Sequence, residues 1–305
     1  MPVGEADKGI GAKKGVIYYG AQTQMTNVQW SHGAIGNEDY IHYGSLNGYI
    51  LLPNIIYGIN DKLNLVFNTT IGMRNMIWKT NKHSLHHRSE NSLSDFANAN
   101  GGILGDSKIM LRYIFKNTSN QEGFRIFGGF GLTIPSNSQL TSDPYFLSEN
   151  SIKEHRHFNL SDGTYNSNFE TQIFYKRNRN PMFIGGFILY ENPLHENKYR
   201  FLPSSRLIVR LSSTYKRFDK IDSSIGYGIS YYHTSKSYWN DKVTPNSESV
   251  TIAPSISFLF NSKYGAHSLS IQKPYTLSGQ LFNNEGEVVD QKTNAFQIVF
   301  SIRVI

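Results

Sequence analysis

The chain has 305 residues and a formal net charge of +7, and only 17% of its residues are charged. That low charge fraction excludes a long disordered protein, and the lack of cysteine excludes disulfide scaffolds, cysteine-ligated metal centres and thiol catalysis. No apolar run approaches the ~18 residues that a membrane helix needs. The chain is instead rich in aromatic residues, with 19 Tyr, 19 Phe and 3 Trp.

Hydrophobic residues alternate with polar or small residues along almost the whole chain, which is the period of a half-buried β-strand. In 291–304, for example, Phe296, Ile298 and Phe300 share one face. The alternation predicts twelve strands, each long enough for the ~9–11 residues of a tilted membrane strand. In chain order they cover 14–25, 38–59, 62–79, 101–117, 122–136, 158–177, 181–194, 201–217, 221–237, 248–261, 265–279 and 291–304.

The predicted connections alternate between tight turns and long loops. Tight turns fall at 60–61, 118–121, 178–180, 218–220 and 262–264, and long loops at 26–37, 80–100, 137–157, 195–200, 238–247 and 280–290. This order is typical of outer-membrane barrels, whose short turns face the periplasm, and lipid forces such a sheet to close because it cannot satisfy a free backbone group. We therefore predict an all-β fold: a 12-stranded antiparallel transmembrane β-barrel over 14–305, with short periplasmic turns and long extracellular loops, preceded by a periplasmic tail over 1–13.

The aromatic residues suggest where the membrane surfaces lie. Trp30, Trp78 and Trp239 fall at the predicted outer ends of strands. A second set falls at the inner ends: Tyr57, Phe115, Tyr175, Tyr215 and Tyr264. This pattern predicts two aromatic girdles. A soluble β-sandwich would explain the alternation, but neither the order of short and long connections nor the tryptophan positions.

Three stretches resemble a known family: Gly102-Ile-Leu-Gly-Asp106 leading to Leu111-Arg112-Tyr113, then Gly128 to Pro135, then Leu160-Ser-Asp-Gly163 ahead of a strand. Over about 101–235 the chain resembles outer-membrane transporter barrels associated with the meta-cleavage pathway of phenol degradation. The resemblance implies a barrel of the bacterial outer membrane that passes small, often aromatic or hydrophobic, molecules. One turn departs from the family, because Pro135-Ser136-Asn137 stands where Pro-Thr-Gly is usual.

Strand parity predicts which charged residues line the lumen. These pore-lining candidates are Lys108, Arg112, Arg125, Glu170, Arg210 and Arg303. Because most are basic, such a wall would favour anions or aromatic carboxylates, whereas the inward Val66, Phe127 and Val299 suit an apolar solute better. The alternative is that the charges pair across a packed, closed interior. We expect an outer-membrane channel for a small aromatic or anionic solute, with outer-membrane lipid around it, no catalytic residue and no cofactor.

Histidines in the predicted outer loops offer a competing role. His83, His86 and His87 form one group, and His155 and His157 form a second. Imidazole is the commonest zinc and copper ligand, so these loops could bind a metal or an outer-membrane protein partner on a structural or accessory barrel. Exposed polar loops also collect histidine without binding metal, and neither cysteine nor a carboxylate pair completes a ligand set.

A lipid-facing His233-Thr234-Ser235 suggests a third role, an esterase in which the histidine activates the serine hydroxyl. Outward polar residues near the outer rim are also ordinary interface residues. Nucleic-acid binding is not expected, since the basic residues are spread through loops and lumen rather than gathered on one face with stacking aromatics.

Overall fold

The computed structural model describes residues 9, 11–33, 39–84, 88–118, 121–145, 155–218, 223–279, 281–282, 288–289 and 291–304. Its strands are β1 (Ile17–His32), β2 (His42–Gly58), β3 (Leu63–Trp78), β4 (Glu90–Asn91), β5 (Leu104–Asn117), β6 (Gly123–Ile134), β7 (Asn166–Lys176), β8 (Phe183–Pro193), β9 (Phe201–Leu202), β10 (Arg206–Phe218), β11 (Ser223–Thr234), β12 (Tyr238–Trp239), β13 (Lys242–Val243), β14 (Ser249–Ser262), β15 (Gly265–Gln272), β16 (Tyr275–Ser278), β17 (Leu281–Phe282), β18 (Val288–Val289) and β19 (Gln291–Val304). Among the described residues, no helix is long and apolar enough to span a membrane.

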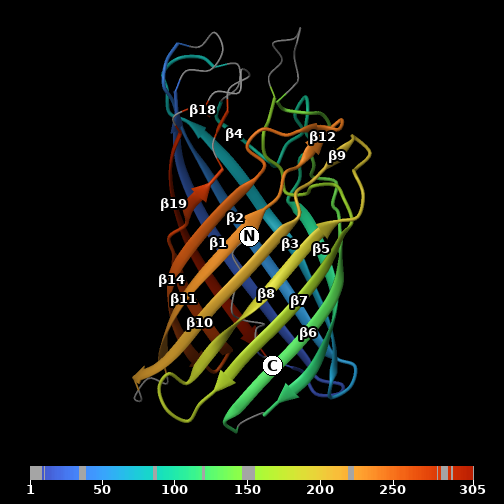
Figure 1. Ribbon diagram of the computed structural model, residues 1–305, viewed down its shortest axis with the longest axis vertical. Helices are drawn as coiled ribbons and strands as arrows, with labels where there is room; N and C mark the ends of the chain where they lie inside the picture. The colour runs from blue at the N-terminus through green and yellow to red at the C-terminus, as the bar shows by residue number, and fades with distance from the viewer. Residues whose placement is uncertain are drawn as a thin grey trace.

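Twelve of these strands form one closed antiparallel barrel, as predicted (Figure 1). In order around the barrel these strands are β1, β2, β3, β5, β6, β7, β8, β10, β11, β14, β15 and β19, and each pairs with the next. The pairing of β19 with β1 closes the ring and leaves the first and last strands side by side. Closure satisfies the edge groups that an open sheet would leave bare in lipid.

The order of turns and loops is also confirmed. One end of the barrel carries the short connections 59–62, 118–122, 177–182, 219–222 and 263–264. The other carries the long connections 33–41, 79–103, 135–165, 194–205, 235–248 and 273–290, which include the short strands β4, β9, β12, β13 and β16 to β18. We refer to the two ends as periplasmic and extracellular, following the arrangement of outer-membrane barrels.

Several strands differ from their predicted bounds, among them β7, which begins at Asn166 and not at 158, and for two others the reason can be identified. β1 runs on to His32, well past the predicted end at residue 25, because it stays paired with β2 and β19 beyond the apolar belt. In this outer part of β1 the outward side chains are polar, so its composition resembles that of a loop and the alternation of apolar residues stops. β15 ends at Gln272, because Pro274 cannot continue a ladder on both sides.

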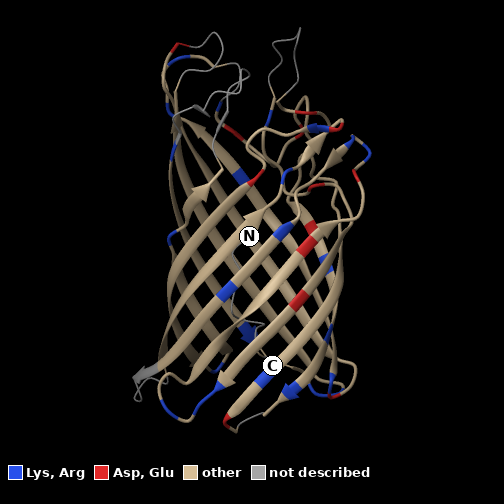
Figure 2. Ribbon diagram, in the orientation of Figure 1, with Lys and Arg blue, Asp and Glu red and all other residues tan. Residues whose placement is uncertain are grey.

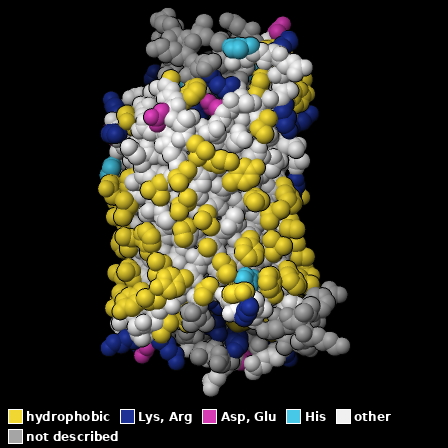
Figure 3. All heavy atoms as spheres, turned by 180° about the vertical axis from the view of Figure 1, so that it is seen from behind, with side chains coloured by type: hydrophobic (Ala, Val, Ile, Leu, Met, Phe, Trp, Pro, Cys, Tyr) yellow, Lys and Arg dark blue, Asp and Glu magenta, His cyan; other side chains and the backbone are white. Residues whose placement is uncertain are grey.

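Burial in this barrel is inverted relative to a water-soluble protein. The inward side chain of Gln172 is fully buried, whereas the outward Phe115 and Leu211 are 66% and 60% exposed. On the face seen in Figure 3, outward apolar side chains form a broad band, with most of the charged residues beyond its two edges. Exposed apolar residues on the other strands, such as Ile173 and Ile188, continue this belt. Such a surface suits lipid and not water, because it exposes a continuous band of apolar area.

The tryptophans do not form the predicted outer girdle. Trp30 lies on the inward face of β1, stacked on His32 at 5.5 Å between ring centroids and 6.2 Å from Trp78. Trp239 is 2% exposed and stacks on Phe201 among the extracellular loops. Alternation alone could not reveal this, because strands continue above the membrane, where an inward aromatic packs against its neighbours.

The extracellular loops above β5 to β11 build an ordered cap with a small core of its own. Ala99, Leu140 and Trp239 form that core. Arg156 is 1% exposed, and its Nη1 atom donates to the backbone carbonyls of Asn91 at 2.7 Å and Ser94 at 3.0 Å. Burial lowers the pKa of Arg156 from its usual value, and nearby carboxylates oppose this shift.

Candidate solute pathway inside the barrel

The barrel has two halves that differ in charge. The charged wall consists of β3, β5, β6, β7, β8 and β10, and the neutral wall consists of β11, β14, β15, β19, β1 and β2. In the neutral wall, Lys292 and Arg303 are the only lysine, arginine, aspartate or glutamate residues of the described strands. The strand charges therefore gather on one side of the barrel (Figure 2).

A buried ion pair occupies the middle of the charged wall. The Nε and Nη2 atoms of Arg112 both lie 2.9 Å from Oε1 of Glu170. Gln172 donates to the same oxygen at 2.7 Å. Both charged side chains are almost fully buried, at 1% and 3% exposure. These two predicted pore-lining residues thus face the interior and compensate each other.

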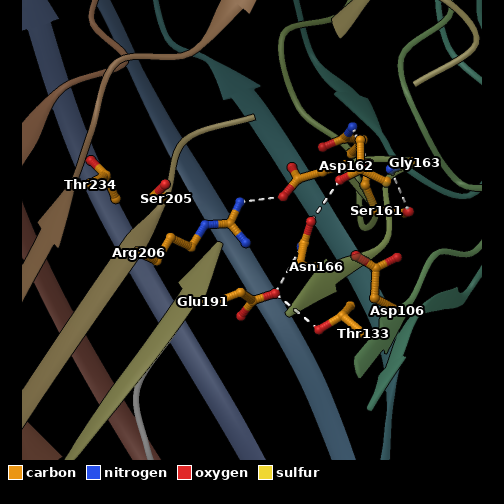
Figure 4. A network of polar contacts seen from close by, with 12 residues as sticks. Asp106, Thr133, Ser161, Asp162, Gly163, Asn166, Glu191, Ser205, Arg206 and Thr234 are labelled. Atoms are coloured by element: carbon orange, nitrogen blue, oxygen red, sulfur yellow. Dashed lines mark hydrogen bonds and ion pairs between the residues drawn. The ribbon is translucent and has the colours of Figure 1, made fainter. Parts of the chain in front are cut away.

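A second network lies nearer the extracellular end, around Glu191. Lys108 donates to its Oε2 atom at 3.1 Å. Thr133 and Asn166 donate to its Oε1 atom at 3.1 and 2.9 Å (Figure 4). The predicted pore-lining Lys108 is therefore also compensated. Sequence reasoning missed Glu191, although its inward parity on the predicted strand 181–194 would have identified it.

The network continues to the loop ahead of β7. Arg206 forms an ion pair with Asp162, which belongs to the Ser-Asp-Gly stretch (Figure 4). Asp106 accepts a hydrogen bond from the backbone of Ser136 at 3.0 Å. Gly163 donates its backbone N–H to Ser161 Oγ at 3.0 Å. The 160–163 stretch lies against the other two, since a Cβ atom on Gly105 would be 2.9 Å from the Leu160 carbonyl oxygen and Ser161 donates its backbone N–H to the Ser138 carbonyl at 2.9 Å. The stretches that carry the family resemblance thus come together where the cap joins the wall.

The other predicted pore-lining residues have neutral partners or sit at the periplasmic end. Arg125 donates to the backbone carbonyl of Gly9 at 3.1 Å. Arg210 donates to the hydroxyls of Ser230 at 2.9 Å and Ser255 at 3.2 Å. Arg303 lies near the end of β19, paired with Ala266 of β15. The interior is thus bound together by hydrogen bonds rather than lined by free cations.

The neutral wall is held by hydroxyl and amide contacts. Ser257 donates to Ser270 at 3.0 Å across β14 and β15. Gln297 donates to Thr26 at 2.7 Å across β19 and β1. Both of these contacts between neighbouring strands join uncharged side chains.

Residues 9, 11 and 12, which precede β1, lie inside the lumen, whereas the sequence predicts a periplasmic tail over 1–13. Among these residues, Gly9 donates to Gln172 at 2.8 Å on the charged wall. Ala12 donates to Asn64 Oδ1 at 3.0 Å, and the Asn64 amide donates back to the Ala12 carbonyl at 2.9 Å. We call residues 9 and 11–13 the plug, because Gly9 and Ala12 contact two separate strands, β7 and β3, inside the barrel.

The plug fits because its residues are small. A Cβ atom on Gly11 would lie 2.2 Å from Ile114 and 3.4 Å from Phe127. Ala12 is 1% exposed and packs with Val66 and other apolar side chains. The glycines of this segment are the only feature of the sequence that suggests close packing of its backbone against the barrel wall. Because glycines are equally common in surface tails, they could not predict the plug.

The histidine groups do not assemble a metal centre among the described residues. His155 and His157 lie side by side, with ring centroids 4.8 Å apart. His83 accepts a hydrogen bond from Tyr40 through its backbone carbonyl, and His86 and His87 lie outside the described residues. In the described part of the chain, no three histidine or acidic side chains lie close enough together to hold a metal ion. The metal hypothesis is not borne out.

The serine of the esterase hypothesis is engaged elsewhere. Ser235 donates its hydroxyl to the Lys236 carbonyl at 3.2 Å and accepts the backbone N–H of Ser205 at 2.9 Å. It lies beyond the end of β11, where strand parity no longer relates it to His233. The local geometry thus gives that hypothesis no support.

Comparisons with known proteins agree on the architecture. No protein-family description and no curated protein matches the chain. Among solved structures, the COG4313 outer membrane channel from Pseudomonas putida F1 has a TM-score of 0.62 at 11% identity, covering 99% of this chain and 100% of that one. The CymD monoaromatic hydrocarbon channel matches with a TM-score of 0.42 at 8% identity over 95% and 89% of the two chains. The closed sheet and its apolar belt, with the likeness of fold to the COG4313 channel, identify the chain as a β-barrel protein of the bacterial outer membrane.

Proposed function

We propose that this protein is an outer-membrane channel for small apolar solutes, aromatic ones above all, and that the plug is its removable obstruction. The observation that carries the proposal is how the plug is attached. It joins the walls through side chains such as Asn64 and Gln172, and not through strand pairing. A segment held this way can leave without breaking the barrel, since each such bond contributes only about 0.5–1.5 kcal/mol.

The surroundings of the plug favour an apolar solute over an anion. Apolar side chains line the lumen at this level: Ile56, Val66, Met110, Ile114 and Phe127, all buried. The charges nearest to them are compensated, as in the Arg112–Glu170 pair. The family resemblance implies aromatic or hydrophobic substrates, and the P. putida protein of similar fold is itself described as a channel.

The test removes the plug from the barrel. A variant lacking residues 1–13 and the full chain are reconstituted in vesicles, and toluene uptake and single-channel conductance are measured. We expect both to rise at least several-fold in the truncated protein. A truncated barrel that folds but passes neither toluene nor ions would overturn the proposal.

A point variant tests the attachment without truncation. Asn64→Ala removes both hydrogen bonds to Ala12 and should raise the frequency of channel opening. Asn168→Ala is the matched control, because Asn168 is equally buried and inward but bonds to Thr133 and Asn166 instead. Equal opening frequencies in the two variants would argue against the plug as a gate.

A further inference from the structure

The two ends of the barrel differ in net charge. We use the name rim for the described segments at the periplasmic end that connect strands or lead into β1, with the last residues of β5 and β7: 14–16, 59–62, 116–118, 121–122, 176–182 and 263–264. The rim has two acidic residues, Asp61 and Glu122, and seven basic ones: Lys14, Lys62, Lys116, Lys176, Arg177, Arg179 and Lys263. The described extracellular connections have nine basic and eight acidic residues. Positive charge is therefore concentrated at the periplasmic end, the lower end in Figure 2.

At the extracellular end, basic side chains have carboxylate partners within the protein. The Nζ atom of Lys82 lies 3.9 Å from Oδ1 of Asp39, and the Nη2 atom of Arg200 lies 2.6 Å from Oδ2 of Asp241. The ion pairs of the charged wall follow the same rule deeper in the lumen. Away from the rim, much of the positive charge is thus neutralised by the protein itself.

At the rim, most of the basic side chains lack such partners within the described part of the chain. The basic residues that form no ion pair with another described residue are Lys14, Lys62, Lys116, Arg177, Arg179 and Lys263, and all of them except Arg177 are exposed.

The two acidic residues of the rim are engaged by neutral donors. Asp61 accepts the backbone N–H of Lys14 at 3.0 Å. Glu122 accepts the Tyr175 hydroxyl at 3.5 Å and the backbone N–H of Asn178 at 3.3 Å. The described protein groups therefore leave a net positive charge at the rim, which an anion from outside the chain can neutralise.

Outward aromatic rings lie beside these cations. The Nζ atom of Lys116 is 5.9 Å from the ring centroid of Phe124, and that ring packs edge-to-face against Tyr175 at 4.8 Å. Phe124 and Tyr175 are register partners on β6 and β7, and the β7–β8 turn with Arg177 and Arg179 follows directly. We call these five residues the rim patch.

This combination of groups is typical of the membrane surface. Aromatic side chains concentrate at the level of the lipid head groups, and lysine or arginine can lay its apolar stem on them while its charge reaches the polar layer. The described connections 59–62, 177–182 and 263–264 are also short, so the rim stays close to that layer. Both features favour lipid over an acidic protein, which would need a surface standing clear of the membrane.

We propose that the rim patch binds an anionic phospholipid of the periplasmic leaflet. Lys116, Arg177 and Arg179 pair with its phosphate, and Phe124 and Tyr175 contact its glycerol and upper acyl chain. Guanidinium groups suit this role because their paired N–H donors match two phosphate oxygens. Each basic residue near a membrane surface strengthens the binding of anionic lipid by about five-fold. This inference does not depend on the channel function.

Electron paramagnetic resonance of spin-labelled lipids tests the proposal. The full chain is refolded into phosphatidylcholine vesicles that contain a trace of phosphatidylglycerol or phosphatidylcholine labelled on its acyl chain. The immobilised fraction of each label gives the association constant of phosphatidylglycerol relative to phosphatidylcholine. We expect a preference of at least two-fold for phosphatidylglycerol. This average is smaller than the local preference, because only a few of the lipids around the barrel occupy the rim patch.

The rim variant carries Lys116→Gln, Arg177→Gln and Arg179→Gln. It should lose at least half of the excess association of phosphatidylglycerol, because three of the cations that recruit the phosphate are gone. High salt should weaken the preference of the full chain in the same direction, since it screens exposed charges. The altered gel mobility of folded barrels in unheated samples checks that the variant is folded.

The matched control removes three exposed lysines from the extracellular end. Lys79→Gln, Lys198→Gln and Lys236→Gln change the net charge by the same amount, and we expect them to alter the preference by less than one fifth. An equal loss in the two variants would overturn the rim patch, because the effect would then follow from net charge alone.

A conservative variant separates charge from folding defects. Arg177→Lys with Arg179→Lys keeps both charges and should retain at least half of the excess association. If it loses as much as the glutamine variant does, positive charge is not what recruits the lipid and the proposal fails. A full chain with no preference for phosphatidylglycerol would also overturn it, and would point instead to an acidic periplasmic protein as the partner of the rim.

Discussion

The charged and neutral walls solve the same problem with different chemistry. Both must fill a lumen with polar side chains while their outer faces meet lipid. The charged wall does so with ion pairs such as Arg112–Glu170, which bind it to its own strands and to the cap. The neutral wall uses hydroxyls such as Ser257 and Ser270.

The largest expected effect of a point variant is in the middle of the charged wall. Glu170→Ala leaves the Arg112 guanidinium buried without its carboxylate, which we expect to cost about 3–5 kcal/mol of unfolding free energy. Urea-induced unfolding in detergent micelles, followed by tryptophan fluorescence, measures the change.

The double variant Glu170→Leu with Arg112→Met is the control. It removes both charges together and should recover most of the lost stability, because no isolated charge remains. A fully additive loss would show that the pair does not act as a unit.

A smaller effect is expected where the cap meets the charged wall. Asp162→Ala removes the partner of Arg206 and should lower stability by about 1.5–3 kcal/mol, the range for hydrogen bonds to charged groups. It should also speed proteolytic cleavage within 155–165, because the loop loses its anchor. Limited proteolysis followed by mass spectrometry reports both the site and the rate.

Asp241→Ala is the matched control for the cap anchor. Asp241 also pairs with an arginine, Arg200, but its side chain is 81% exposed. Exposed pairs contribute about 0–1 kcal/mol. Similar losses for the two aspartates would contradict an anchoring role for Asp162.

On the neutral wall the expected effect is smaller again. Ser270→Ala removes one hydroxyl contact with Ser257 and should cost about 1 kcal/mol, because no charge is left unpaired. The same urea titration measures it. A loss as large as that of Glu170→Ala would erase the difference between the walls.

The smallest signal concerns the tryptophans. Single-tryptophan variants that keep Trp30 or Trp239 should be quenched little by brominated lipid, because one ring faces inward and the other is buried in the cap. Strong quenching of either would restore the girdle that the sequence predicts. A tryptophan placed at the outward, exposed Phe115 supplies the fully quenched reference.

The strands and their order follow from sequence because each depends on local rules. Alternation at period two places Phe296, Ile298 and Phe300 on one face whatever their partners are, and parity sends Arg112 and Glu170 inward in the same way. That these two charges meet could not be predicted, because their contact depends on how β5 and β7 lie across the lumen. The described residues give the histidine and esterase hypotheses no support, because spacing along the chain does not fix the distances between side chains.

The sequence alone determined the closed sheet, its apolar outside and the alternation of turns and loops. These features follow from the alternation of apolar and polar residues along each strand and from the composition of the turns, both of which depend only on residues close together in the chain. Only the tertiary structure decided that residues 9 and 11–13 lie within the lumen, that the charges pair, and that β16 departs from β19. Each of these depends on contacts between segments far apart in the chain, whose free energies no local pattern encodes.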